Sequence, residues 1–361
     1  MRALERKLVR DLWRMRGQLV AAALVMACGI ATLTMSRSTV ASLETARDTF
    51  YQRYRFPHVF AHVRRAPTAL LPRIADIPGI AQARPRIVVE VNLDIPDFHE
   101  PATARLISIP ERPPFGLSEL HVTRGRLPEP GRGSEVVVSE TFAEAHDLHP
   151  GATVYAVING RRQALTVVGF VLSPEFVYQV RPGDVLPDNL RYGVFFMPDR
   201  ELAAAFDLDG AFNDIVVSLT PDASEAEVIA RLDDLLTPWG GQGAHGRRDQ
   251  PSDRYIRDEL SQLRTMSIIP PGIFLSAAAF ILNIIFSRFV RSQREQIAAL
   301  KAFGYGRWAI ATHYLGMALV MSLLGSAVGI VAGWRLGVAM TEMYGRFYRF
   351  PVFDFEFDRT G

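Results

Sequence analysis

The sequence contains a single cysteine, Cys28, among its 361 residues. No disulfide can therefore form within the chain, and the cysteine content does not indicate the redox compartment. Any folded domain must be stabilised by its own packed core, and the roughly 225 residues between the first two apolar stretches are enough to form one.

Charge is missing from three stretches. Residues 17–36, 265–287 and 308–334 contain no Asp, Glu, Lys or Arg. At about 1.5 Å per helical residue, each is long enough to cross roughly 30 Å of hydrocarbon. The sequence therefore predicts three transmembrane helices. A cleaved signal peptide is the alternative for the first, but its basic region and apolar run are long and no A-x-A site follows.

Familiar catalytic motifs are also missing. The patterns G-x-x-x-x-G-K-[ST] and G-x-S-x-G do not occur, and the glycine cluster 240–246 has no lysine. His146 and His149 lie three residues apart without a third candidate ligand nearby. We expect no catalytic residue, cofactor or metal site, and no ATP hydrolysis by this chain. Residues 37–264 show no basic patch with interleaved aromatics, so nucleic acid is not an expected partner.

Basic residues are concentrated in two places. Residues 1–16 carry six basic and two acidic side chains, and residues 288–307 carry five and one. Residues 37–264 carry 25 Arg, no Lys and 31 acids, a net charge of 25 − 31 = −6. Because short basic segments stay in the cytoplasm, we expect the N-terminus and the 288–307 loop inside. Residues 37–264 and the tail 335–361 are then outside.

Residues 1–16 place apolar side chains near one helical face, which predicts a cytoplasmic amphipathic helix. This helix is either an anchor in the lipid headgroups or a contact with the other spans or a cytoplasmic partner. Helical apolar spacing continues from Val40 to Tyr54 and recurs from Ile256 to Leu263. The sequence therefore predicts two helical stalks between the spans and the outer domain.

The region between the stalks alternates short strand and helix patterns, which predicts an extracytoplasmic α+β domain. Strand–helix–strand groups at its two ends are expected to form one layer, with a β-rich subdomain at about 110–190 inserted between them. Asn159-Gly160 between two apolar runs predicts a hairpin. Residues 238–253 are rich in glycine and polar residues and predict a flexible linker.

Two of the predicted spans carry unusual residues. Pro270-Pro271 near the outer end of the second span predicts a kink. Gly325, Gly329 and Gly333, here called the glycine face, recur every fourth residue in the third span. Small residues at this spacing let helices approach closely. The glycine face is either a packing surface within the bundle or a self-dimerisation surface.

The 288–307 stretch joins the second and third spans. Ile297, Leu300 and Phe303 recur at helical spacing and predict a short amphipathic helix. Gly304 and Gly306 are expected to end it before the next span. A basic helix between two spans, on the cytoplasmic side, is a candidate contact for a cytoplasmic protein.

Residues 291–310, RSQREQIAALKAFGYGRWAI, resemble the R-x-x-E-[IV]-x-x-L-[KR]-[AS]-x-G stretch of FtsX/MacB-type ABC transporter permeases. The matching positions are Arg291, Arg294, Glu295, Ile297, Leu300, Lys301, Ala302 and Gly304, with Gln296 shifting the apolar position by one. The order of parts also agrees: span, large outer domain, span, basic loop, glycine-rich span. That family has a fourth span, so the sequence looks like the N-terminal part of a truncated or split permease.

The resemblance implies a MacB-like periplasmic core domain on a multi-pass permease of a bacterial plasma membrane. It implies three partners: a cytoplasmic ABC ATPase, a second permease copy or half, and the lipid membrane. Closure of the ATPase would move the loop, and the stalks would carry this motion outward to export or extract a lipoprotein, peptide or drug-like substrate. The residues implied in ATPase coupling are Arg291, Arg294, Glu295, Ile297, Leu300, Lys301, Phe303 and Gly304.

Two other functions stay open. A membrane-anchored sensor without transport accounts for the spans and the outer domain, but not for the family-like loop. A regulator of an extracytoplasmic hydrolase keeps the coupling mechanism and changes its output.

Overall fold

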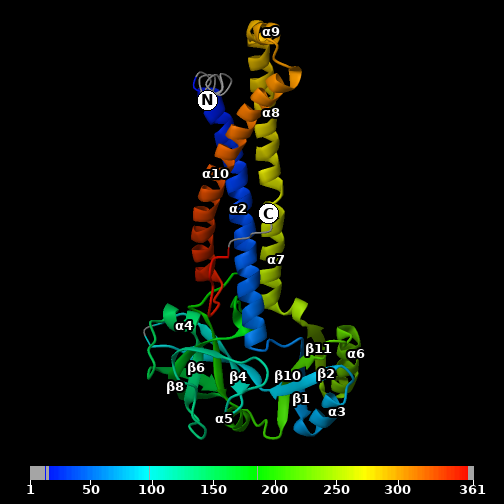
Figure 1. The fold of residues 1–361 in the computed structure, drawn as a ribbon. Coiled ribbons are helices and arrows are strands. Elements are labelled where there is room, and N and C mark those ends of the chain that lie inside the picture. The colour runs from blue at the N-terminus through cyan, green and yellow to red at the C-terminus, as the bar shows by residue number, and fades with distance from the viewer. Residues whose placement is uncertain (1–12, 14–15, 97, 185, 357–361) are drawn as a thin grey trace. The chain divides into compact units, whose positions relative to one another are not determined.

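The computed structural model describes residue 13 and residues 16–96, 98–184 and 186–356 (Figure 1). The helix predicted for residues 1–16 lies almost wholly outside these residues. The contacts divide the chain into two compact units. The helical unit comprises the described parts of residues 1–45, 259–346 and 353–361, and the sheet unit comprises residues 46–258 and 347–352.

Helices make up most of the described part of the helical unit, and the first two also extend into the sheet unit. In chain order they are α2 (Arg16–Arg53), α7 (Pro251–Met266), α8 (Ile269–Ser292), α9 (Arg294–Ala302) and α10 (Arg307–Phe347). Among the described residues, three helical stretches are long and apolar enough to cross a membrane: Arg16–Arg53, Pro251–Ser292 and Arg307–Phe347. They contain the three predicted spans. α2 and α7 also contain the stalk segments, because helical apolar spacing continues outside the spans.

The two prolines of the second span lie at the start of a helix and not inside one. α7 ends at Met266, and α8 begins at Ile269 with Pro270 and Pro271 in its first turn. Amides of the first turn have no partner within the helix, so proline is tolerated there. The predicted kink is therefore a break between two helices.

One layer of the sheet unit combines the two ends of the outer region. Its antiparallel strands lie in the order β11 (Gly241–Gly246), β1 (Val59–Pro67), β10 (Ala211–Leu219) and β2 (Ile80–Arg86). The apolar side chains of α3 (Leu71–Ala75) and α6 (Glu225–Leu236) share one core with those of β1 and β10. The predicted α+β layer is confirmed.

The prediction of a flexible linker at residues 238–253 is wrong. This segment forms β11 between two short 3-10 turns and then begins α7. β11 exists because β1 offers it an edge, on which Phe60 pairs with His245. Gly240 turns the chain into the strand in the left-handed region, with φ at +75°.

The second sheet is a small barrel. Its strands lie in the order β5 (His121–Gly125), β8 (Arg161–Leu172), β6 (Glu135–Ser139), β9 (Tyr192–Pro198), β4 (Ala102–Ile109), β3 (Val88–Asp94) and β7 (Thr153–Ile158). β7 also pairs with β8 and closes the sheet. The short helices α4 (Glu140–Ala145) and α5 (Asp199–Ala205) follow β6 and β9. The barrel extends beyond the predicted subdomain on both sides, because β3, β4 and β9 complete its wall.

The hairpin at Asn159-Gly160 joins β7 to β8. Both residues have positive φ, +47° and +73°, as a two-residue hairpin turn of this kind requires. Ile158 pairs with Arg161 directly beside the turn. The pairing register places apolar side chains from β3, β4, β6, β7, β8 and β9 in one core, which includes Leu106, Val138, Phe170 and Phe195 together with Phe142 of α4.

Candidate functional site

α9 and the residue after it leave an apolar stripe only partly covered. Ile297 and Leu300 are half-buried, Phe303 is 81% exposed, and no residue of α9 is buried. An amphipathic helix normally buries such a stripe, and clustered exposed apolar side chains mark interaction surfaces. The described part of the chain therefore leaves this face of α9 available to a partner.

The basic side chains around α9 are also available. Arg291, Arg294 and Lys301 are exposed, and none forms an ion pair within the described residues. Glu295 lies in the first turn of α9, where the helix dipole favours a carboxylate. The surface of α9 thus combines an apolar stripe with cations that an acidic partner could neutralise.

Gly304 sets the direction in which the chain leaves α9. Its φ is +85°, and Tyr305 N donates to Leu300 O at 3.1 Å while Gly304 N donates to Lys301 O at 3.0 Å. A glycine in the left-handed region with these bonds is a common helix ending. Trp308 follows at the start of α10 and is 83% exposed.

The glycine face lies against α2 of the same chain. A Cβ at Gly325 would be 3.0 Å from Ala23 O, one at Gly329 would be 2.8 Å from Ala27 O, and one at Gly333 would be 2.7 Å from Ala31 O. The contacts advance by four residues on both helices, so the chain runs in the same direction in α2 and α10. Backbones this close require residues without side chains.

A Gly329→Leu substitution is expected to separate α2 from α10. Its Cβ would lie 2.8 Å from both Ala27 O and Ile30 Cβ, so the backbones must move toward the roughly 8–10 Å spacing of helices with ordinary side chains. Distances between spin labels on the two helices of the full-length chain would measure the movement. Val328→Leu, at a 56% exposed position on the same helix, should leave the distance unchanged. An unchanged distance in both variants would contradict the close packing.

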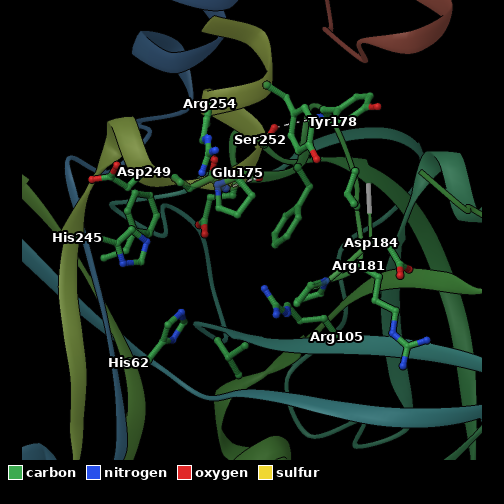
Figure 2. Close-up of a pocket in the computed structure, with 18 of the residues that line it drawn as sticks. His62, Arg105, Glu175, Tyr178, Arg181, Asp184, His245, Asp249, Ser252 and Arg254 are labelled. Atoms are coloured by element: carbon green, nitrogen blue, oxygen red, sulfur yellow. Dashed lines mark hydrogen bonds between the residues drawn. The ribbon is translucent and has the colours of Figure 1, made fainter. Parts of the chain in front are cut away.

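The sheet unit contains a cavity of about 360 Å³, lined by residues of both sheets, of the 174–184 segment and of α7 (Figure 2). Figure 2 shows His62 and His245 on one side of it and Arg181 and Asp184 on the opposite side. Its lining carries acidic and basic side chains together with aromatic rings. The cavity lining therefore combines apolar surface with charged side chains of both signs.

A buried charge cluster borders this cavity. Asp214 Oδ1 accepts a hydrogen bond from Arg86 Nε at 2.5 Å, and its Oδ2 lies 2.5 Å from His62 Nδ1. Arg86 Nη1 also donates to Glu175 Oε1 at 2.5 Å. Burial alone would raise the pKa of Asp214, but the charges of Arg86 and His62 hold it at about 2. The carboxylate is thus fixed in its ionised form.

This cluster joins the two sheets. Arg86 and Asp214 belong to the four-stranded sheet, whereas Glu175 follows barrel strand β8. Next to Asp214, the amide of Asn213 donates to Val88 O and accepts from Val88 N, both at 2.8 Å. No group of three or more His, Cys, Asp or Glu in the described residues could hold a metal ion. The hydrogen bonds of Arg86 and Asn213 make this region a structural joint between the two sheets.

Sequence reasoning missed this joint. The available signal was Arg84 and Arg86 on either side of Pro85, because side chains two apart on a strand share a face. Both are buried in the structure, and Arg84 donates to the carbonyls of Leu117 and Ser108. From the sequence alone, two arginines on one face of a strand predict a solvent-exposed edge. The structure shows instead that both side chains are buried.

Two protein families match the sequence. The MacB-like periplasmic core domain matches residues 19–235, which is more than half of the chain. The FtsX-like permease C-terminal domain matches residues 268–356. The first match runs from α2 to α6 and ends before β11, and the second contains α8, α9 and α10. Comparison with curated proteins gave no match.

Two of the solved structures that are similar to the chain are extracytoplasmic regions. The extracellular domain of the noncanonic ABC-type transporter YknZ from Gram-positive bacteria is 14% identical, with a TM-score of 0.34, covering 53% of this chain and 98% of that one. The periplasmic region of MacB from Actinobacillus actinomycetemcomitans is 14% identical, with a TM-score of 0.36, covering 58% and 95%. The assignment of the chain to a family rests on the two family matches. The TM-scores of these structures are too low to support it.

Proposed function

The chain belongs to the FtsX/MacB-type family of ABC transporter permeases, and we propose that it couples ATP hydrolysis in a separate cytoplasmic ATPase to motion of its extracytoplasmic domain. Permeases of this family pair with ABC ATPases. In this chain the ATPase contact is α9 with the turn that follows it. The coupling residues are Arg291, Arg294, Glu295, Ile297, Leu300, Lys301, Phe303 and Gly304.

The observation that supports this contact most strongly is the exposure of α9. A helix nine residues long has no buried residue although Ile297, Leu300 and Phe303 share one face. Exposing this stripe to water is unfavourable, at about 25 cal/mol per Å² of apolar surface. A groove on a partner would cover the stripe, and acids at its rim would pair with Arg294 and Lys301.

Motion at α9 can reach the outer domain through helices. α9 is joined to α8 and, through the turn at Gly304, to α10. α2 is a single helix of 38 residues that belongs to the helical unit up to Thr45 and to the sheet unit from Ala46. An uninterrupted helix is the stiff element that mechanical transmission needs, and α2 contacts α10 along the glycine face.

The work is done on the extracytoplasmic side, in the export or extraction of a lipoprotein, peptide or drug-like molecule. The three predicted spans contain no Asp, Glu, Lys or Arg, and polar pathways through membranes are usually lined by ionisable residues. The N-terminus and α9 face the cytoplasm of a bacterial cell, because the segments around them are the most basic of the chain.

Purification of the full-length chain from native membranes in mild detergent tests this function. Recovery of a protein with ABC ATPase sequence, identified by mass, is expected, together with ATP hydrolysis by the purified complex. The matched control is the same preparation from cells that lack the chain. Recovery of no ABC ATPase from membranes that contain candidates would overturn the proposal and favour an anchored sensor domain.

A further inference from the structure

An apolar groove of about 310 Å³ lies between the N-terminal part of α2 and residues 320–324 of α10. It is lined by Trp13, Arg16, Leu19, Val20, Ala23, Val320, Met321 and Leu324. All but Arg16 are apolar or aromatic, and no acidic residue is among them. The groove belongs to the helical unit alone and is unrelated to α9.

The groove begins where the glycine face ends. Gly325 contacts Ala23, but one turn earlier on the two helices the facing residues are Met321 and Leu19. These larger side chains are buried in a small cluster with Ala22, so the backbones cannot approach closely there. Figure 1 shows α2 and α10 crossing and then diverging toward their N-terminal ends. The divergence opens a slot on one side of the cluster.

The slot is short and almost wholly apolar. From Arg16 to Ala23 the slot runs along seven residues, which is about 10 Å of helix and lies within one leaflet of a bilayer core roughly 30 Å thick. A flexible hydrocarbon chain fits these dimensions.

The mouth of the groove carries the side chains that a lipid headgroup would meet. Arg16 is exposed, and its guanidinium lies 5.6 Å from the centre of the Trp13 ring. Tryptophan prefers the membrane–water interface, and a guanidinium binds phosphate oxygens with two donors at once. Basic sites between membrane helices recognise anionic headgroups, and residues 1–16 carry six basic against two acidic side chains.

We propose that this groove binds an anionic phospholipid of the surrounding bilayer, in the leaflet at the N-terminal end of α2. One acyl chain lies along Val20, Ala23 and Leu324, and the phosphate contacts Arg16. The lipid fills the gap that the diverging helices leave beside the Leu19–Met321 contact. The proposal concerns the helical unit only, so it does not depend on the ATPase contact.

Native mass spectrometry of the purified full-length chain tests the site. Phosphatidylglycerol and phosphatidylcholine with identical acyl chains are added separately, and the fraction of protein that retains lipid is measured. Phosphatidylglycerol is expected to be retained more strongly. Arg16→Gln should reduce its retention on the order of fivefold, the effect of one interfacial cation, and should reduce retention of phosphatidylcholine less, because the choline cation offsets the phosphate charge. Arg288→Gln is the matched control, because Arg288 is exposed on α8 and does not line the groove.

A second variant tests the binding of the acyl chain independently of the binding of the headgroup. Val20 is 55% exposed in the groove, so Val20→Trp fills the slot without crowding the core. It should reduce retention of both lipids, and circular dichroism should show unchanged helix content. Equal retention of the two lipids by the unaltered chain, or equal effects of Arg16→Gln and Arg288→Gln, would overturn the proposal. A dimer that Val20→Trp dissociates would overturn it too, because a second copy would then occupy the groove.

Discussion

A Leu300→Asp variant is expected to lose its association with the cytoplasmic ATPase almost completely. Leu300 lies in the centre of the apolar stripe, between Ile297 and Phe303 on the helix surface. A carboxylate at this position would have to be desolvated when the stripe is covered, at a cost of ~3 kcal/mol or more. This corresponds to a loss of affinity on the order of 100-fold. Co-purification of the ATPase with the full-length chain measures it.

Two further variants show whether the loss is due to the apolar and charged surface of α9. Leu300→Met keeps the apolar volume and should retain association, since such exchanges are well tolerated. Arg294→Glu reverses one of the exposed charges of α9 and should also abolish association. Hydrogen exchange in the sheet unit should be identical in all three variants, because α9 has no buried residue. Full association in both Leu300→Asp and Arg294→Glu would show that the coupling role assigned to α9 is wrong.

The parts of the fold that the sequence predicted are those specified locally. Uncharged stretches and continued apolar spacing predict long helices, because an α-helix makes its backbone hydrogen bonds within itself. Asn159-Gly160 predicts its hairpin because both residues tolerate the positive φ of the turn. The stretch from Ile297 to Gly304 contains an amphipathic period and a helix-ending glycine, and the structure has α9 and its turn at these positions.

The parts that the sequence could not predict depend on partners far along the chain. β11 has the composition of a linker and becomes a strand only because β1 lies beside it, about 180 residues away in sequence. β2 contains Pro85 and two arginines, and it is ordered as the edge strand next to β10, a position where proline is tolerated. For the same reason, nothing local indicated that Arg86 would meet Asp214 and Glu175.

An Asp214→Ala variant is expected to destabilise the sheet unit more than any surface substitution. Asp214 is fully buried. Of the two carboxylates described above as bonded to Arg86, its removal leaves only Glu175. Removal of one partner from a buried ion pair typically costs about 3–5 kcal/mol, because the other charge stays buried and uncompensated. Hydrogen exchange of β1 and β10 in the full-length chain should accelerate on the order of 100-fold or more.

The same carboxylate should make the stability of the sheet unit depend on pH in the acid range. The folded pKa of Asp214 is lowered to about 2, against roughly 3.9 for an unfolded aspartate. A carboxyl group whose pKa is lowered by folding stabilises the folded state fully at a pH above its unfolded pKa. This stabilisation is lost as the pH falls through its folded pKa. Stability should therefore fall between about pH 4 and pH 2, by roughly 2–3 kcal/mol for this group.

A comparison with Asp214→Asn isolates this contribution. The pKa of Glu135 is also lowered to about 2, first through its hydrogen bond to Arg126, so the variant should keep that part of the acid dependence and lose the part due to Asp214. The full-length chain is incubated at each pH and then labelled briefly with deuterium at one common pH. The protection of β1 and β10 in the variant should be lower near neutral pH and should change less between pH 4 and pH 2. Parallel profiles for the two proteins would contradict an ionised Asp214 in the buried cluster, and would locate the acid dependence at Glu135 or at other carboxylates.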